Sequence, residues 1–212
     1  MEIYLIRHTT PAVAKGTCYG QTDLDLTDSL SEEAAVIRRH LPAGIVSVHS
    51  SPLRRCARLA EYLFPAHTVR LHPDLMEIHC GHWEMKHWDE LPKEDLDPWM
   101  KDFVQLRIPG GESYLDLFER VNHCYRSIRD GQAGDPGGAQ AAGDAIAIIS
   151  HGGPIRSILS EMTNTPLIDS FKVFSLHYGC VVRLSDEGGV WRHEVLSNPV
   201  PAEKEQHKPK NG

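Results

Sequence analysis

The sequence has no run of apolar residues close to the roughly 18–20 that a membrane-spanning helix needs. Its N-terminus also lacks the order of basic, apolar and small residues that is typical of a secretory signal peptide, because Arg7 and His8 interrupt the first apolar run. We therefore expect no membrane partner and a cytoplasmic location.

A basic stripe is missing as well. Acidic residues outnumber lysine and arginine by 29 to 22, which gives a formal net charge of −7. Nucleic-acid-binding domains more often carry clustered positive charge, so we expect no nucleic-acid partner. If such an acidic chain binds an anion, it has to concentrate positive charge at one place.

Cysteines are few, odd in number and widely scattered, which favours free thiols over a disulfide framework. Strong zinc patterns are also absent. One group of possible ligands lacks both C-x-x-C pairing and an H-x-x-x-H helical face; it consists of His79, Cys80, His82 and His87. We expect no metal and no cofactor, and a metal held by this group is the less favoured alternative.

What the chain does have is an alternation of strand and helix patterns. Short apolar runs predict strands over residues 2–6, 45–49, 68–71, 144–150, 177–184 and 190–196. Helices are predicted between them, one after a Ser29-x-x-Glu32 capping box, one opening at Pro52 and one over 154–162. This alternation predicts an α/β fold, a three-layer sandwich with a mostly parallel central sheet and helices on both faces.

The length of 212 residues suits one domain, which we place at residues 1–198, followed by a frayed polar tail over 199–212. Residues 84–108 are rich in tryptophan, proline and acidic residues, and they predict a small, partly helical cap insertion that covers a site. Small residues over 131–143 predict a surface loop.

Cationic side chains follow three of the predicted strands. Arg7 and His8 end the first strand, and Arg55 comes shortly after the second. His151 follows the strand over 144–150, and His151-Gly152-Gly153 lies just before the helix predicted over 154–162. Carboxyl ends of parallel strands meet at one edge of a sheet, and a helix N-terminus there favours an anion. We expect these side chains to form one positive cluster that binds phosphate.

Each of these features also has an ordinary explanation. A single histidine at a strand end is more often a capped surface residue, and a chain with 13 histidines makes coincidence easier. Arginines at a helix start usually line a solvated face. The joint pattern, with a cation after each of three strands, nevertheless favours the phosphate site.

Five short motifs occur in order along the chain. They are Arg7-His8-Thr9, Ser51-Pro52-Leu53-Arg54-Arg55, Leu75-Met76-Glu77-Ile78-His79-Cys80-Gly81-His82-Trp83-Glu84, Gly110-Gly111-Glu112-Ser113 and Ser150-His151-Gly152-Gly153. Together they resemble the histidine phosphatase superfamily, in the branch that includes the cofactor-dependent phosphoglycerate mutases. Three positions depart from the family pattern: Thr9 and Leu30 replace common glycines, and Ala14 replaces a common asparagine. These departures bear on substrate choice more than on chemistry.

The resemblance implies a metal-independent phosphatase that works through a phosphohistidine intermediate. His8 attacks phosphorus, while Arg7, Arg55 and His151 hold the phosphoryl oxygens. Glu77 is the candidate acid that protonates the leaving group and then activates water. An alternative role for Glu77 is that of an ion-pair partner that positions an arginine.

Within the family, the loop from Thr17 to Asp23 resembles the α-ribazole phosphatases of cobalamin nucleotide-loop synthesis. This implies a small-molecule phosphate ester, α-ribazole 5′-phosphate, as the substrate, with contacts from Thr17, Gly20, Gln21 and Gly152. The acidic cap argues against a doubly anionic substrate. The alternatives are a phosphoglycerate mutase, a phosphatase for other or many phosphate esters, and a non-catalytic phosphate-binding module. Monomer and homodimer both remain open.

Other residues of the motifs have predicted supporting roles. Glu84 is expected to be structural, and Glu112 and Ser113 to cap the helix that follows them. Aromatic residues in and beside the insertion either stack on the flat base of a ligand or form the insertion's own core; they are Trp83, Trp88, Trp99 and Phe103.

Overall fold

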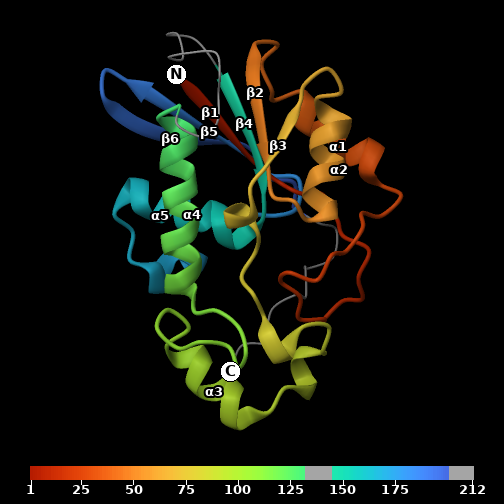
Figure 1. Cartoon of the computed structure of the whole chain (residues 1–212), viewed down its shortest axis with the longest axis vertical. Coiled ribbons are helices and arrows are strands. Elements are labelled where there is room, and N and C mark those ends of the chain that lie inside the picture. Colours follow the sequence, from red (N-terminus) through yellow and green to blue (C-terminus); the bar gives the residue numbers. More distant parts are fainter. Residues whose placement is uncertain (132–144, 201–212) are drawn as a thin grey trace.

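The computed structural model of the chain describes residues 1–131 and 145–200 (Figure 1). Nearly all of the predicted loop over 131–143 and most of the predicted tail over 199–212 lie outside these residues. The described part holds a six-stranded sheet in the order β3-β2-β4-β1-β5-β6. Its strands are β1 (Glu2–Arg7), β2 (Ile45–Ser50), β3 (Val69–Leu71), β4 (Ala145–Ser150), β5 (Val181–Glu187) and β6 (Val190–Ser197).

The sheet is mostly parallel. Strands β3, β2, β4 and β1 run parallel to their neighbours, whereas β5 runs antiparallel to β1 and β6 antiparallel to β5. All six residues of β4 are buried, as expected for an apolar run that becomes a central strand. The predicted α/β fold is confirmed.

Helices cover both faces of the sheet (Figure 1). In β1, Ile3 and Leu5 pack in the core formed with α4 (Tyr114–Arg129) and α5 (Gly152–Thr163). Tyr4 and Ile6 point to the opposite core, formed with α1 (Leu30–Arg38) and α2 (Arg54–Leu63). This alternation follows from the two-residue period of a strand. The remaining elements are α3 (Lys93–Lys101), α6 (Ser170–Val173) and the 3-10 turns η1 (Pro73–Leu75), η2 (Gly81–Trp83), η3 (Trp88–Glu90) and η4 (Leu167–Asp169).

Two predicted helix starts are wrong in detail. Ser29 forms no capping box with Glu32, because its hydroxyl donates to Glu33 (2.5 Å) instead, and that carboxylate also accepts from the backbone N–H of Thr10 (3.0 Å). The helix predicted from Pro52 begins at Arg54, since the intervening residue still has extended backbone (φ −61°, ψ 134°).

Two other boundaries also moved. Helix α5 begins at Gly152, two residues before the predicted 154, because the backbone of His151 is still extended (φ −121°, ψ 176°) and turns helical directly after it. Strand β5 begins at Val181 and not at His177, because Gly179 (φ +70°) turns the chain just before it. In both cases the boundary is set by backbone conformation at a glycine or its neighbour, which apolar periodicity does not report.

The insertion after η2 lies beyond the carboxyl ends of the parallel strands, with α3 at its far side (Figure 1). Its aromatic residues pack on one another: the Trp83 ring meets those of Trp99 (centroids 5.3 Å apart) and Trp88 (6.2 Å) edge to face. The Trp83 side chain is 1% exposed. Trp83, Trp88 and Trp99 thus contribute to a core of the insertion, and stacking of any of these aromatic residues on a ligand stays a prediction.

None of the helices in the described ranges is both long and apolar enough to cross a membrane.

Candidate active site

The register of the sheet brings the two strand-end histidines together. Arg7 of β1 pairs with Ser150 of β4, and the backbone N–H of His8 donates to the Ser150 carbonyl (3.0 Å). The rings of His8 and His151 meet edge to face with centroids 5.1 Å apart. Both side chains are buried, at 2% and 0% exposure. The motifs around residues 8 and 151 therefore share one site.

The hydrogen bond of His8 fixes which ring nitrogen carries the lone pair. Its Nδ1 lies 2.7 Å from the carbonyl oxygen of Thr9, and a carbonyl oxygen only accepts. Nδ1 therefore carries the proton, and in the neutral imidazole Nε2 has the lone pair. That is the nitrogen from which a nucleophilic attack can start.

A hydrogen bond from Arg55 likewise fixes the tautomer of His151. The Arg55 side chain is completely buried, and its Nε donates to Nδ1 of His151 (3.2 Å). Because arginine only donates, Nδ1 accepts, and Nε2 of the neutral ring donates to the Ser51 hydroxyl (2.8 Å). Burial, reinforced by the positive charges of Arg55 and its neighbours, holds the pKa of His151 well below its usual value. His151 thus enters the site as a neutral donor, and the positive charge comes from arginines.

Arg7 lies between the sheet and two tyrosines that the sequence did not point to. Its Nη1 donates to the Leu176 carbonyl (2.6 Å), and its guanidinium lies 4.0 Å from the ring centroid of Tyr178. The Tyr178 hydroxyl is 2.6 Å from that of Tyr19. Burial raises the pKa of Tyr19, although the positive charge of Arg7 opposes this. Tyr178 reaches the site because β5 starts opposite the carboxyl end of β1, a pairing without a local sequence signal.

A third arginine, Arg156, was also missed. It lies one helical turn after Gly152 in α5, so its guanidinium extends back towards the helix N-terminus. A Cβ atom at Gly152 would lie 2.8 Å from Nη1 of Arg156 and 3.5 Å from Nε of Arg7. Arg156 is 5% exposed, and its Nε donates to the Phe174 carbonyl (2.9 Å). The i, i+4 spacing from Gly152 is the signal that could have found it.

Glu77 reaches the same helix end from the other side. Its Oε2 accepts from the backbone N–H of Gly153 (3.1 Å), and its Oε1 accepts from the backbone N–H of Ile78 (2.9 Å). A Cβ atom at Gly153 would lie 2.2 Å from Glu77 Oε1. Only glycine at position 153 therefore admits the carboxylate to this place, which explains the second glycine of the motif.

The loop after β1 is held by Glu84 and by Arg55. The carboxylate of Glu84 accepts from the backbone N–H groups of Gly20 (3.0 Å) and Gln21 (2.8 Å) and from the Thr22 hydroxyl (2.6 Å). Burial raises the pKa of Glu84, but these hydrogen bonds outweigh it and lower that pKa. The carbonyls of Gly20 (2.6 Å) and Thr22 (2.9 Å) accept from Arg55. The expected structural role of Glu84 fits these contacts.

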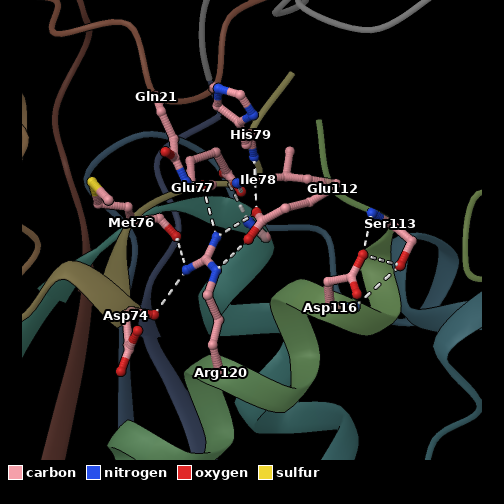
Figure 2. Close-up of polar contacts among 12 residues, drawn as sticks. Gln21, Asp74, Met76, Glu77, Ile78, His79, Glu112, Ser113, Asp116 and Arg120 are labelled. Carbon is pink, nitrogen blue, oxygen red and sulfur yellow. Dashed lines mark hydrogen bonds and ion pairs between the residues drawn. The ribbon is translucent and has the colours of Figure 1, made fainter. Parts of the chain in front are cut away.

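The four predicted substrate contacts occupy different environments. The Gly20 carbonyl accepts from Arg55, and Gly152 lies next to the guanidinium groups of Arg7 and Arg156. The Gln21 amide donates to the Glu77 carbonyl (3.1 Å; Figure 2). Thr17 is buried and bridges to His87 of the insertion. The structure contains no substrate, so contact with one stays a prediction for all four.

Two further observations bear on the predicted chemistry. Thr9, which replaces the family's glycine, is fully buried, and its hydroxyl has no hydrogen-bond partner among the described residues.

Across the same residues, no group of three or more histidine, cysteine, aspartate or glutamate side chains is placed to hold a metal ion. The rings of His82 and His87 pack against different glycines, Gly110 and Gly16.

The arrangement suits transfer of a phosphoryl group. A buried imidazole with its lone pair on Nε2 lies beside arginines, a second neutral imidazole and the N-terminus of α5, which together can offset the charge of a phosphoryl group. One carboxylate, that of Glu77, lies at the edge of this cluster. Proton transfer, nucleophilic attack and charge stabilisation therefore each have a candidate group.

Comparison with known proteins gives a consistent result. A sequence model described as histidine phosphatase superfamily (branch 1) matches residues 3–199. Relatives named probable phosphoglycerate mutase GpmB, from Escherichia coli and Shigella boydii, are 31% identical over 174 residues, which is 78% of this chain and 76% of the relative.

Solved structures share the fold. The α-ribazole phosphatase from Shigella flexneri superposes with a TM-score of 0.79 at 23% identity, covering 92% of this chain and 96% of that one. A mycobacterial glucosyl-3-phosphoglycerate phosphatase gives a TM-score of 0.74 at 21% identity, covering 93% and 99%.

Proposed function

The chain belongs to branch 1 of the histidine phosphatase superfamily, and we propose that it is a phosphomonoesterase that passes the phosphoryl group through His8. The observation that supports this most directly is the tautomer of His8. Its Nδ1 proton is held by the Thr9 carbonyl, so in the neutral ring the lone pair lies on Nε2, which can act as the nucleophile. A binding module needs the cations but has no need of a nucleophile in this protonation state.

In the first step, the lone pair of His8 Nε2 forms a bond to phosphorus while the bond from phosphorus to the ester oxygen breaks. Arg7, Arg55 and the N-terminus of α5 offset the charge on the non-bridging oxygens, and His151 exchanges its Nε2–H hydrogen bond to Ser51 for one to a phosphoryl oxygen. Glu77 gives its proton to the departing oxygen, so that an alcohol leaves and a phosphohistidine remains.

In the second step, the Glu77 carboxylate takes a proton from water as the water oxygen bonds to phosphorus. The bond from phosphorus to His8 Nε2 breaks, and inorganic phosphate leaves. Both histidine and carboxyl group then return to their starting forms. Glu77 lies at the N-terminus of α5, within hydrogen-bond distance of Gly153, and this position supports a role beside the phosphoryl group in both steps.

The substrate that we propose is a small-molecule phosphate ester, with α-ribazole 5′-phosphate as the first candidate. The support is the loop from Thr17 to Asp23, whose carbonyls hold Arg55, together with the fold shared with the Shigella flexneri α-ribazole phosphatase.

A phosphoglycerate mutase is the second candidate, because the relatives that share 31% identity with this chain carry that name. A mutase has to retain a substrate with a carboxylate and a phosphate, so it needs cations beyond the phosphoryl site. The described cap residues offer exposed ones: Lys86, Lys93, Lys101 and Arg107, the last paired with Asp116. Acidic residues outnumber these cations there, which favours the phosphatase.

The decisive experiment is release of inorganic phosphate from α-ribazole 5′-phosphate, compared with 3-phosphoglycerate, several sugar phosphates and an aryl phosphate, all with EDTA present. We expect hydrolysis that depends on His8 and an acid-labile phosphoenzyme after rapid quenching. The His8→Ala variant serves as the control for both measurements.

The outcomes separate the parts of the proposal. Activity that is confined to the aryl phosphate keeps the phosphohistidine chemistry and removes the α-ribazole assignment. Isomerisation of 3-phosphoglycerate without phosphate release identifies a mutase. A folded wild-type protein that hydrolyses none of the esters, or a His8→Ala variant that remains active, refutes the proposed function.

A further inference from the structure

Arg120 of α4 forms a network of side-chain hydrogen bonds beside Glu77 (Figure 2). Its guanidinium has five N–H donors, and each has an acceptor. Nε and Nη2 donate to the two carboxylate oxygens of Glu112, both at 2.8 Å. The other bonds go to main-chain carbonyls, from Nη1 to Asp74 (2.9 Å) and Met76 (2.8 Å) and from Nη2 to Glu77 (2.9 Å).

Glu112 continues the network to the other end of the insertion. Its Oε2 accepts from the backbone N–H of His79 (2.9 Å), and its own backbone N–H donates to the His79 carbonyl (3.0 Å). Residues 79 and 112 lie on the two chain segments that lead into and out of the insertion over 84–108, and we call these two segments its stem; the hydrogen bonds between His79 and Glu112 close it. The Arg120–Glu112 pair therefore ties the stem to α4. We call this pair, with the carbonyls it binds, the stem clamp.

The stem clamp is partly buried and electrostatically complementary. The side chains of Arg120 and Glu112 are 18% and 21% exposed. Burial raises the pKa of Glu112, but the hydrogen bonds and charge of Arg120 outweigh it and lower that pKa. Bidentate pairs of this kind fix orientation as well as distance. The geometry is therefore suited to hold a segment in place.

What the stem clamp holds is the main chain of Glu77. Residues 77–80 belong to no helix or strand, so no ladder of backbone bonds fixes them. The Glu77 carbonyl is instead held from one side by Arg120 and from the other by the Gln21 amide (3.1 Å). Its carboxylate then has to meet the Gly153 amide within a space that excludes even a Cβ atom. A small shift of the main chain would move the carboxylate off this position.

From this geometry we infer that Arg120 and Glu112 are positioning residues that hold Glu77 where it can protonate the leaving group. The inference rests on the proposed function, because it takes Glu77 as the acid. It assigns no substrate contact to either residue. Misplacement of a reacting group by a fraction of its hydrogen-bond length is costly for proton transfer, and it leaves the phosphoryl-binding cations unaffected.

The test uses the dependence of rate on the leaving group. Dinitrophenyl phosphate expels a stable anion that needs no proton, whereas phenyl phosphate expels a basic oxygen that does. The parameter kcat/KM with each ester reports on transfer to His8 only, because it stops at the first irreversible step. We expect Arg120→Met and Glu112→Gln to lose at least about thirtyfold on phenyl phosphate and at most about threefold on dinitrophenyl phosphate.

Three variants frame the result. Glu77→Gln should show the same selective loss, at equal or greater size. Arg126→Met is the matched control, since Arg126 lies on the same helix and pairs with Glu161 (2.8 Å) without touching residues 74–79; it should change neither rate. Arg120→Lys keeps the charge without the planar fork, and we expect it to recover less than half of the lost activity.

The failure modes are distinguishable. If Glu77→Gln is selective but folded Arg120→Met and Glu112→Gln lose activity equally on both esters, or lose none, the positioning role is refuted and the proposed function stands. If Glu77→Gln itself loses activity equally on both esters, the acid is another group, and the inference falls together with that part of the mechanism. Glu112→Gln, which keeps the shape of the side chain, decides the matter if Arg120→Met does not fold.

Discussion

The phosphoryl site and the stem clamp both depend on arginines that are fully or partly buried, but only in the stem clamp is the positive charge balanced by a carboxylate. At the stem clamp, the charge of Arg120 is matched by Glu112, and all five donors have acceptors. At the phosphoryl site, Arg55 donates to two carbonyls and an imidazole, and Arg156 donates to one carbonyl. No ion pair between described residues compensates either of these two guanidinium groups.

The difference shows what each region is built for. A matched and fully bonded pair stabilises one geometry, which is the property of a support. Unmatched buried cations near a helix N-terminus are unfavourable on their own, and Arg156 shows the effect: burial and the neighbouring Arg7 lower its pKa. Such a cluster becomes favourable when a dianion enters. The phosphoryl site is therefore electrostatically unfavourable until an anion binds, whereas the stem clamp holds one fixed geometry.

The largest expected effect comes from removing charge at the phosphoryl site. Arg55→Met should lower kcat by about a hundredfold to a thousandfold, the usual effect of deleting one preorganised donor for a developing anion. The assay is turnover of phenyl phosphate at saturation. Arg54→Met is the control, because the neighbouring Arg54 is 55% exposed and pairs with Asp23; equal losses in the two variants would contradict the comparison.

A second experiment compares the effects of Arg120→Met and Arg156→Met on the free energy of unfolding, which should have different signs or sizes. Arg120→Met should lower the free energy of unfolding by about 3 kcal/mol, because Glu112 and three carbonyls lose their partner. Arg156→Met should leave the free energy of unfolding unchanged or raise it by about 1 kcal/mol, because it removes an uncompensated buried charge. Urea unfolding followed by tryptophan fluorescence measures both. Similar destabilisation by the two substitutions would remove the distinction drawn here.

The pH dependence of stability sharpens the same contrast. Since the pKa of Glu112 is lowered in the folded protein, its stabilisation is complete above the unfolded value of about 4.3 and is lost as the pH falls through the folded value. At pH 7, Glu112→Gln should cost about 1–2 kcal/mol, and the cost should shrink on acidification. Thermal unfolding of both proteins between neutral and acidic pH checks this; a cost that grows on acidification would reverse the assigned sign.

The smallest expected effect concerns the hydroxyl of Thr9. The stem leaves no donor of Arg120 unused, whereas the phosphoryl site contains this buried hydroxyl without a described partner. Thr9→Val keeps the shape and removes the unpaired group, so stability should rise by about 1 kcal/mol or less. Chemical denaturation measures the change, with Thr9→Ser, which keeps the hydroxyl, as the comparison. A loss of stability in Thr9→Val would mean that the hydroxyl is satisfied in solution.

Much of the fold follows from local patterns in the sequence. The apolar run of β4 predicts a central strand, and Arg7-His8 directly after an apolar run predicts two polar side chains at a sheet edge. The capping role of Ser113 is confirmed, since its hydroxyl and the Asp116 side chain form a capping box. Glu112, predicted to share that role, instead pairs with Arg120. Each correct prediction depends on neighbours within a few residues.

The mistaken details depend on competition between partners. Ser29 has a capping-box spacing to Glu32, but Glu33 also serves Thr10 across the fold and takes the hydroxyl. Tyr178 and Arg156 reach the active site through the pairing of β5 with β1 and the side on which α5 packs. Arg120 donates to the main-chain carbonyls of Asp74, Met76 and Glu77. Every residue has a main-chain carbonyl, so no sequence pattern indicates these partners.

By itself, the sequence determined the order of strands and helices, the nucleophile candidate at the end of the first strand and the family of the chain, because periodicity and short motifs are local properties of the backbone and its side chains. Only the tertiary structure decided the tautomer of His8, the neutral state of His151, the presence of Arg156 in the phosphoryl site and the stem clamp that holds Glu77. These depend on the burial of groups distant in sequence and on the register that places one residue's donor opposite another's acceptor.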